Sequence, residues 1–202
     1  MTLYYEQEEY ADRDFSSQDL RDAEFRQCTF VRCRFRGARM EDLRTEHCQF
    51  VDCDMTGVLM NGAIHRNSAF TNCLLTGANL FAAVFEECKL VGSDLTECQM
   101  NGFTIKGGDW SYTNLRHANL SRQDLRGVRF VESDLMECNL EKADLREADL
   151  TRAILAKAKL VGADLREARL DGVDFPSLQV KGARMDLTQA VLFLRSYGAK
   201  VE

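Results

Sequence analysis

The sequence lacks several features that would assign it to common functional classes. Its apolar runs are far shorter than the roughly 20 residues of a membrane-spanning helix. It opens MTLYYEQEEY, without a basic and then apolar stretch, so we expect no signal peptide. The net charge of −6 argues against direct binding to DNA or RNA, which requires a basic surface. The glycines form no Walker or Rossmann motif.

Although no export signal is seen, the chain contains eight cysteines. This combination is typical of the reducing cytoplasm, where disulfides are rare, so we expect a cytoplasmic protein. The cysteines recur in pairs, as CTFVRCRF at 28–35 and CQFVDCDM at 48–55. Taken alone, these pairs are compatible with a metal site, with disulfides or with no chemistry at all.

A repeat of five residues accounts for most of the chain. Large apolar residues occupy 34 of the 36 positions at multiples of five from Tyr10 to Met185, and the exceptions are Thr45 and His65. The residue two positions before each apolar centre is usually small. Eleven of the 13 glycines lie two positions after a centre, where a tight turn favours glycine. Because a period of five fits neither helix nor strand, the chain must turn in every repeat.

This repeat explains the cysteines. All eight lie two residues before an apolar centre, in the slot that alanine fills elsewhere. A cysteine in such a slot behaves as a small buried hydrophobic residue. A zinc site would require clustered ligands, usually with histidine. We therefore expect reduced, structural cysteines, no metal site and no cofactor.

The pattern A-[DN]-L-x-x, as in ADLRE at 143–147 and 163–167, resembles that of the pentapeptide-repeat proteins. The resemblance implies an all-β solenoid, a right-handed quadrilateral β-helix of about nine coils with four pentapeptides per coil, followed by a short C-terminal α-helix. It divides the chain into an N-terminal lead-in (1–9), the β-helix (10–185) and a helix with a tail (186–202). Thr45 and His65 then stack in adjacent coils, where we expect a local irregularity.

Residues 186–197, DLTQAVLFLRSY, change from the five-residue period to a helical one. Asp186 or Thr188 can cap this helix and Gly198 can end it. One apolar stripe would suffice to cover the end of the solenoid, whereas this helix has apolar residues on two sides. The second apolar surface predicts burial by a partner. The residues expected to form this dimer contact are Leu187, Val191, Leu192, Phe193, Leu194 and Tyr197.

The solenoid, the short helix and the tail are together similar to the Qnr and MfpA quinolone-resistance proteins, as is the segment HRNSAFTNC at 65–73. This likeness implies a homodimer that binds DNA gyrase or topoisomerase IV and contacts neither nucleic acid nor membrane. It also implies an elongated acidic surface that imitates duplex DNA, and protection against quinolones or another topoisomerase poison. Qnr proteins from many Gram-negative hosts carry loops that interrupt the repeats, and this sequence has none.

The charges form local acidic spots and no continuous stripe when the pentapeptides are assigned to four faces. Aspartate beside the central leucine belongs to the repeat itself, so part of the acidity is a by-product of the fold. The candidates for partner contacts are Asp94, Glu97, Asp134 and Glu137 on one face, and Glu86 and Glu87 on another.

We expect no enzyme, because a regular solenoid has a solid core and flat faces, whereas catalysis requires groups held together in a pocket. His65 has no predictable serine, cysteine or carboxylate partner. The alternative to a gyrase-binding protein is a pentapeptide-repeat scaffold with an unrelated protein partner, since a fold does not fix a function.

Overall fold

The computed structural model describes residues 3–201, which form two units, one ending at Asp109 and the other beginning at Trp110. The first unit contains all ten regular strands, each three residues long, and the second contains a 3₁₀-helix and an α-helix. The strands are β1 (Tyr4–Glu6), β2 (Glu9–Ala11), β3 (Glu24–Arg26), β4 (Thr29–Val31), β5 (Arg44–Glu46), β6 (Gln49–Val51), β7 (Ile64–Arg66), β8 (Ala69–Thr71), β9 (Val84–Glu86) and β10 (Thr104–Lys106). The helices are η1 (Phe175–Ser177) and α1 (Leu187–Ser196).

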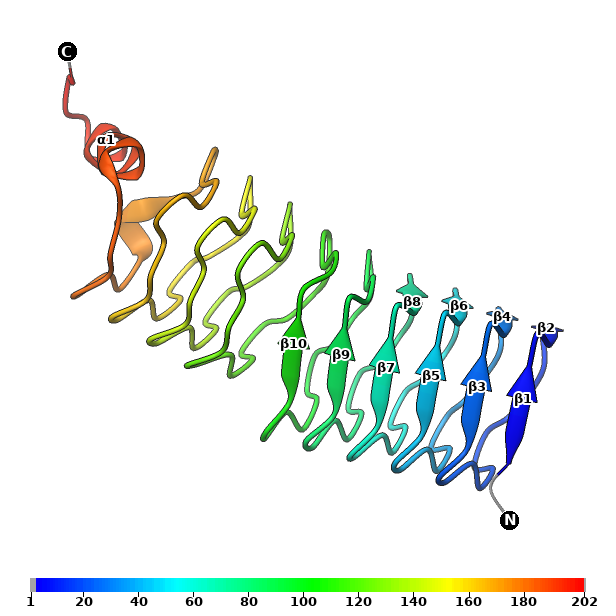
Figure 1. Cartoon of the computed structure of the whole chain (residues 1–202). Helices are drawn as coiled ribbons and strands as arrows, with labels where there is room; N and C mark the ends of the chain where they lie inside the picture. The colour runs from blue at the N-terminus through cyan, green and yellow to red at the C-terminus, as the bar shows by residue number, and fades with distance from the viewer. Residues whose placement is uncertain (1–2, 202) are drawn as a thin grey trace. The chain divides into compact units, whose positions relative to one another are not determined.

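The strands of the first unit form two parallel sheets (Figure 1). One has the order β1-β3-β5-β7-β9-β10 and the other the order β2-β4-β6-β8. Each residue pairs with the residue 20 positions further on, as in Phe30 with Phe50. One coil is therefore four pentapeptides. The segment 1–9, expected as a lead-in, contains β1, which already pairs with β3.

The second unit keeps the same 20-residue register without regular strands. Isolated parallel bridges join Asn114 to Asp134, and Asp144 to Asp164. The amide of Leu145 donates to the carbonyl of Asp164 at 2.8 Å. Because the turns are so close together, only one residue of each pentapeptide forms a bridge to the neighbouring coil.

The predicted fold class, a quadrilateral β-helix with a short C-terminal helix, is confirmed. Regular strands cover only part of the nine coils that were expected, and isolated bridges continue the same 20-residue register in the second unit. The physical reason is the same short spacing between turns, which limits most of the second unit to single bridges.

The apolar centres fill the interior of each unit. In the first unit, Phe30, Phe50 and Phe70 form a column of nearly parallel rings, with centroids 4.8 and 4.7 Å apart. This spacing matches the distance between paired strands, so the ladder of backbone hydrogen bonds and the ring stack share one period. Trp110 and Leu145 are equally buried in the second unit.

The corner of each repeat has a left-handed backbone. Gly37 (φ +56°) confirms the turn that the glycine pattern predicts. However, Glu147 (φ +60°) and many other charged or polar residues adopt the same conformation at equivalent positions. Because this region is unfavourable for residues with a Cβ, the hydrogen bonds between coils must hold these corners in place.

Candidate functional site: charged and apolar surfaces

Four of the predicted partner-binding acids lie in the first unit. Glu86 ends β9 and its carboxylate lies 3.2 Å from Nε of Arg66. Glu87 and Glu97 are exposed, and Asp94 is half-buried. Among residues 3–201, neither Glu87, Asp94 nor Glu97 forms an ion pair, so their charges are free to meet a partner.

The other two acids lie in the second unit and are already paired. The carboxylate of Asp134 lies 2.6 Å from Nε of Arg116. Glu137 lies 3.3 Å from Nζ of Lys157 and 3.5 Å from Nδ1 of His117. Because Asp94 and Glu97 belong to the first unit, the expected grouping of these four acids stays a prediction.

The aspartate that directly precedes an apolar centre stabilises the turn of its repeat. In Asp94, one carboxylate oxygen accepts the amide N–H of Thr96 at 2.9 Å. Such bonds close a short turn and satisfy an amide that has no sheet partner. The interpretation that part of the acidity is a by-product of the fold is therefore confirmed. Equivalent bonds form at Asp14, Asp54, Asn79, Asn114, Asn119, Asp124, Asp134, Asn139, Asp144, Asp149 and Asp164.

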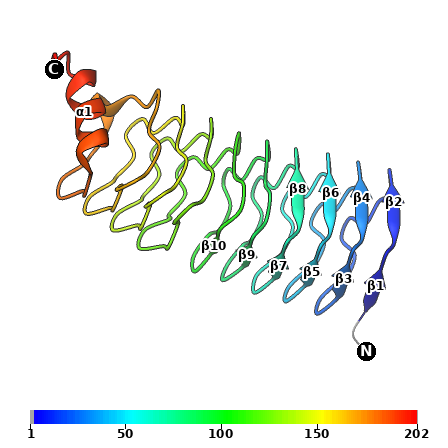
Figure 2. The same ribbon diagram turned by 45° about the horizontal axis from the view of Figure 1, so that its top comes forward.

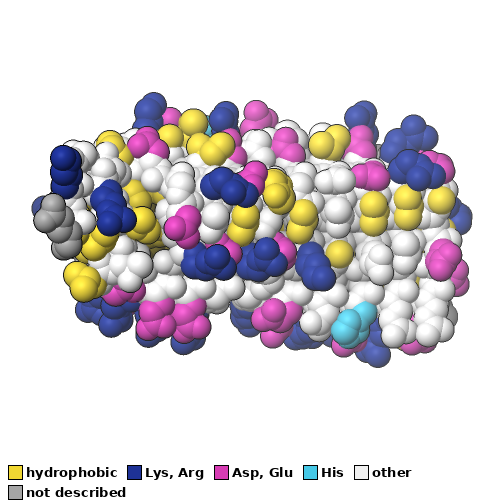
Figure 3. Space-filling model, turned by 90° about the horizontal axis from the view of Figure 1, so that it is seen from above, with side chains coloured by type: hydrophobic (Ala, Val, Ile, Leu, Met, Phe, Trp, Pro, Cys, Tyr) yellow, Lys and Arg dark blue, Asp and Glu magenta, His cyan; other side chains and the backbone are white. Residues whose placement is uncertain are grey.

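Many of these aspartates also neutralise an arginine. Asp144 and Arg146 form two hydrogen bonds, at 2.9 and 2.6 Å, and Asp164 pairs with Arg166 in the same way. The guanidinium of Arg166 lowers the pKa of Asp164 to about 2. Positive and negative side chains alternate on the face drawn in Figure 3, and no single sign dominates it. That face thus carries no continuous row of negative charge among the described residues.

His65 lies inside the first unit, where it stacks on Thr45 in the paired strands β5 and β7. Its Nδ1 is 2.9 Å from Oγ1 of Thr45, which in turn donates to Oγ of Ser68 at 3.1 Å. The expected irregularity is wrong: the strand register continues unbroken, and His65, Thr45 and Ser68 form a chain of hydrogen bonds. Ser68, in the small-residue slot, is a partner that the sequence reading missed.

This polar cluster cannot meet a substrate, because His65, Thr45 and Ser68 are all buried. Nε2 of His65 has no hydrogen-bond partner and lies among the rings of Phe70 and Phe85. Burial lowers the pKa of His65 to about 3, so the ring is neutral at physiological pH. The cluster is a structural feature of the core.

The cysteines occupy the interior slot that the repeat predicts. All eight are free thiols, and all but the half-buried Cys98 are fully buried. Seven of the Sγ atoms lie near backbone carbonyls of the preceding coil, as in Cys53 with Phe30 at 3.4 Å, and Sγ of Cys28 lies near the carbonyl of Arg26. Within residues 3–201, no three histidine, cysteine or acidic side chains are grouped as metal ligands.

Helix α1 and η1 lie side by side in the second unit (Figure 2). Asp186 caps α1 by accepting the amides of Thr188 (2.9 Å) and Gln189 (3.2 Å), as predicted. Gln189 is buried and donates to the carbonyl of Ala168 at 3.0 Å. A polar residue therefore fixes the helix to the solenoid, which the apolar stripes did not predict. The capping box formed by Asp186 and Gln189 marks Gln189 as a residue of the helix start, but it does not indicate the bond to Ala168.

The predicted dimer residues divide between two faces of α1. Phe193 packs toward the solenoid, with its ring 5.6 Å from that of Phe175. Val191 and Leu192 are half-buried. Leu187, Leu194 and Tyr197 are 80%, 48% and 59% exposed. The second apolar surface that the sequence predicts is thus present on the outer side of the helix. In the described part of the chain, no helix has the length and apolar character needed to cross a bilayer.

Comparison with solved structures identifies related folds. A trypsin-treated variant of QnrB1, described as a plasmid-mediated fluoroquinolone resistance protein, aligns with a TM-score of 0.86, covering 98% of this chain and 99% of that one, at 18% identity. Full-length QnrB1 gives a TM-score of 0.85 at 17% identity, covering 97% and 100% of the two chains. HetL, described as a pentapeptide-repeat protein involved in heterocyst differentiation regulation from the cyanobacterium Nostoc, gives a TM-score of 0.51 at 23% identity, covering 90% and 86% of the two chains.

Sequence comparison gives the family. None of the curated protein sequences matches the chain significantly. The family described as pentapeptide repeats matches it in eight copies, over residues 14–42, 78–102, 113–152 and 148–186. These segments make up more than half of the chain and follow the register seen in both units. The chain belongs to the pentapeptide-repeat family.

Proposed function

We propose that this protein binds a type II topoisomerase, DNA gyrase or topoisomerase IV, in the cytoplasm and protects it from quinolones or another poison. The observation that carries the proposal is the structural likeness to QnrB1, which extends over 98% of this chain. QnrB1 is described as a fluoroquinolone resistance protein. At 18% identity this likeness gives the fold, so the function rests on the chemistry of the surface as well.

Free carboxylates are the groups suited to such a contact. A topoisomerase presents basic residues where it holds DNA, and unpaired acids can take the place of phosphates there. Glu87, Asp94 and Glu97 form no ion pair among the described residues, so a partner need not break one to reach them. Asp134, Glu137 and Glu86 would first have to exchange a partner, which makes them weaker candidates. In this proposal, the protein imitates DNA with a few unpaired carboxylates at defined positions and not with a continuous row of charge.

The test is a gyrase supercoiling assay with purified protein, with and without a fluoroquinolone. We expect inhibition of gyrase alone or recovery of supercoiling in the presence of the drug. Asp94→Asn/Glu97→Gln removes two charges while the new amide oxygen still accepts the Thr96 amide. We expect this variant to weaken the effect several-fold.

A matched control comes from the same spacing elsewhere: Asp144→Asn/Glu147→Gln removes two charges from the repeat ADLRE, where Arg146 already pairs with Asp144. Equal loss in both variants would point to net charge alone. No effect of the wild-type protein on several bacterial gyrases would refute the proposal.

The second candidate is a scaffold for an unrelated protein. The resemblance to HetL favours keeping it, because that pentapeptide-repeat protein is described as involved in heterocyst differentiation regulation. Under this alternative the protein has no effect in the supercoiling assay, whereas it still forms a homodimer through α1. The outer apolar face of α1, with Leu187 and Leu194, is the contact we propose for a homodimer in either case.

A further inference from the structure

Strand β1 lies at the end of its sheet and pairs only with β3 among the described residues. One coil further on, the amide of Glu24 donates to the carbonyl of Leu3 at 2.8 Å, and the carbonyl of Arg26 accepts from Gln7 at 2.9 Å. The backbone groups of residues 24 and 26 are therefore directed toward the preceding coil. Tyr4 and Glu6 occupy the same positions in β1, so their backbone groups point away from the sheet.

Strand β2 has the same open edge. In β4, the amide of Thr29 donates to Glu8 at 2.8 Å, and the carbonyl of Val31 accepts from Asp12 at 2.9 Å. The equivalent residues of β2 are Glu9 and Ala11, which have no strand beyond them in the described part of the chain. An unpaired edge of this kind is a template for another extended segment.

The charges around β1 and β2 favour a basic partner. Residues 3–20 contain six acidic side chains and one arginine, a formal charge of −5 out of −6 for the whole chain. Asp12, Asp14 and Asp19 are paired with arginines. The three glutamates form no ion pair among residues 3–201, and they lie on or between the two edge strands: Glu6, Glu8 and Glu9.

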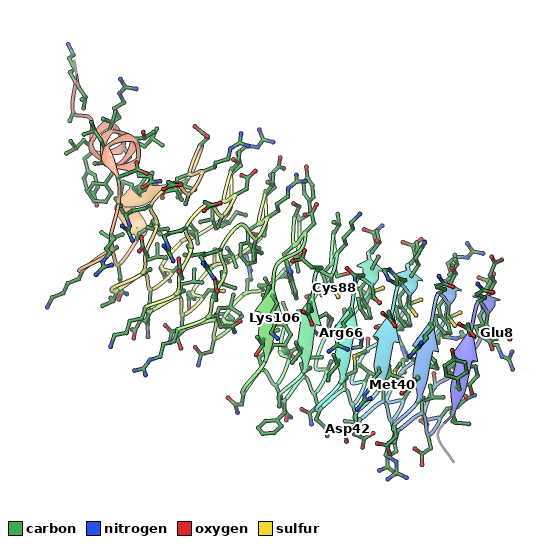
Figure 4. The ribbon with its side chains drawn as sticks, in the orientation of Figure 1. Glu8, Met40, Asp42, Arg66, Cys88 and Lys106 are labelled. Atoms are coloured by element: carbon green, nitrogen blue, oxygen red, sulfur yellow. The ribbon has the colours of Figure 1, made fainter. Side chains whose placement is uncertain are left out.

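The interior at this end is closed. Glu8, labelled in Figure 4 at the β1–β2 end of the first unit, occupies the slot that Cys28 fills one coil later. The guanidinium of Arg13 lies 5.2 Å from the ring centroid of Tyr10 and 5.5 Å from that of Phe15. The ring of Tyr10 stacks on that of Phe30, so this cation covers the end of the aromatic column. A segment added here therefore needs small residues facing inward.

We propose that the edge formed by β1 and β2 binds an extended basic segment of a partner protein by strand addition, with small side chains inward and lysine or arginine outward. A second copy of this edge is disfavoured, because the unpaired glutamates Glu6, Glu8 and Glu9 of two such ends repel each other. The proposal concerns a site other than the gyrase contacts and does not depend on them.

The first experiment measures fluorescence anisotropy of a labelled peptide, acetyl-KTKVKTK-amide, on titration with the full-length protein. We expect saturable binding that weakens with salt. Glu8→Lys/Glu9→Lys should weaken it about tenfold or more. Glu147→Lys/Glu167→Lys makes the same charge change at exposed corners elsewhere and should leave binding at the edge nearly unchanged. Equal losses in the two variants would overturn the proposal.

The second experiment tests the backbone pairing without changing the protein. In a parallel addition the amide of the peptide's valine, whose side chain points inward, donates to the edge, whereas the amides of the flanking lysines point away. N-methylation of the valine amide should weaken binding about tenfold, and N-methylation of an adjacent lysine amide should not. Hydrogen exchange should slow at the amides of Tyr4 and Glu9.

Two results would contradict strand addition. If both methylated peptides bind like the parent, the attraction is purely electrostatic. If no peptide binds at millimolar concentration, the glutamates serve only to keep edges of different copies apart.

Discussion

The imidazole of His65 and the hydroxyl of Thr45 lie 2.9 Å apart in the core, at the only two positions of the repeat that lack a large apolar centre. Thr45 donates to Ser68, and Ser68 donates to the carbonyl of Arg66 at 2.9 Å. The order of donors requires the Nδ1–H tautomer of His65, which leaves Nε2 as an unpaired acceptor. Two polar substitutions are tolerated because they occur together, in register.

We predict that His65 makes the stability of the protein depend on pH. Its pKa is about 3 when folded and near 6.5 when unfolded, so the unfolded chain binds more protons between these values. The contribution of neutral His65 to the free energy of unfolding is therefore complete above pH 6.5 and is lost as the pH falls toward 3. The free energy of unfolding then falls by up to about 1.4 kcal/mol per pH unit. Urea unfolding of the wild type and of His65→Leu, compared from pH 7.5 to 5, measures it.

The control for this prediction is His47→Leu. His47 is exposed and lies outside the buried cluster, so its replacement tests whether the effect requires the buried histidine. If His65→Leu loses stability with pH as steeply as the wild type over this range, then His65 does not carry the effect.

A second prediction separates the charge of Asp94 from its turn. Asp94→Asn keeps an oxygen acceptor for the Thr96 amide, whereas Asp94→Ala leaves that amide without its side-chain acceptor. We expect the free energy of unfolding to change little in the first variant and to fall by about 1 kcal/mol in the second. Denaturant titrations of both proteins check this. Equal losses would mean that the carboxylate charge, and not the hydrogen bond, stabilises the turn.

The sequence predicts those parts of the fold that the five-residue period specifies directly. The 20-residue coil is what the family resemblance implies. Large residues at each centre, and small ones such as Cys53 two positions before it, follow from the requirement that one side of every pentapeptide be buried. The start of α1 was equally predictable, because Asp186 is a good cap. These features depend on local pattern and repeat alone.

Other features depend on which side chains meet between coils. Ser68 reaches Thr45 across 23 residues, and Gln189 reaches Ala168 across 21, so neither contact has a local signal. The pairing of Asp134 with Arg116 likewise decides that this acid is not free. The period places residues on faces, but it does not choose ion-pair partners among the several cations within reach.

A third prediction concerns the thiols. Burial raises the pKa of Cys88, Cys98 and Cys138 to about 12, so almost no thiolate forms at pH 8. We expect a thiol reagent to modify at most the half-buried Cys98 in the native protein, and all eight cysteines in guanidinium. Counting the thiols that react in each condition tests this. Rapid reaction of several cysteines in the native state would show that the coils open.

The last prediction concerns the outer face of α1. Leu187 and Leu194 are 80% and 48% exposed, whereas the opposite face is fixed by Gln189 and Phe193. Burial of two leucines contributes roughly 1.5–3 kcal/mol each, enough to shift a dimerisation constant by more than tenfold. We expect sedimentation velocity to find a dimer for the wild type and a monomer for Leu187→Gln/Leu194→Gln. Thr188→Gln/Ser196→Gln changes exposed polar positions of the same helix and should stay dimeric. A monomeric wild type at high micromolar concentration would contradict the dimer, and the apolar face would then have to be covered by a different protein.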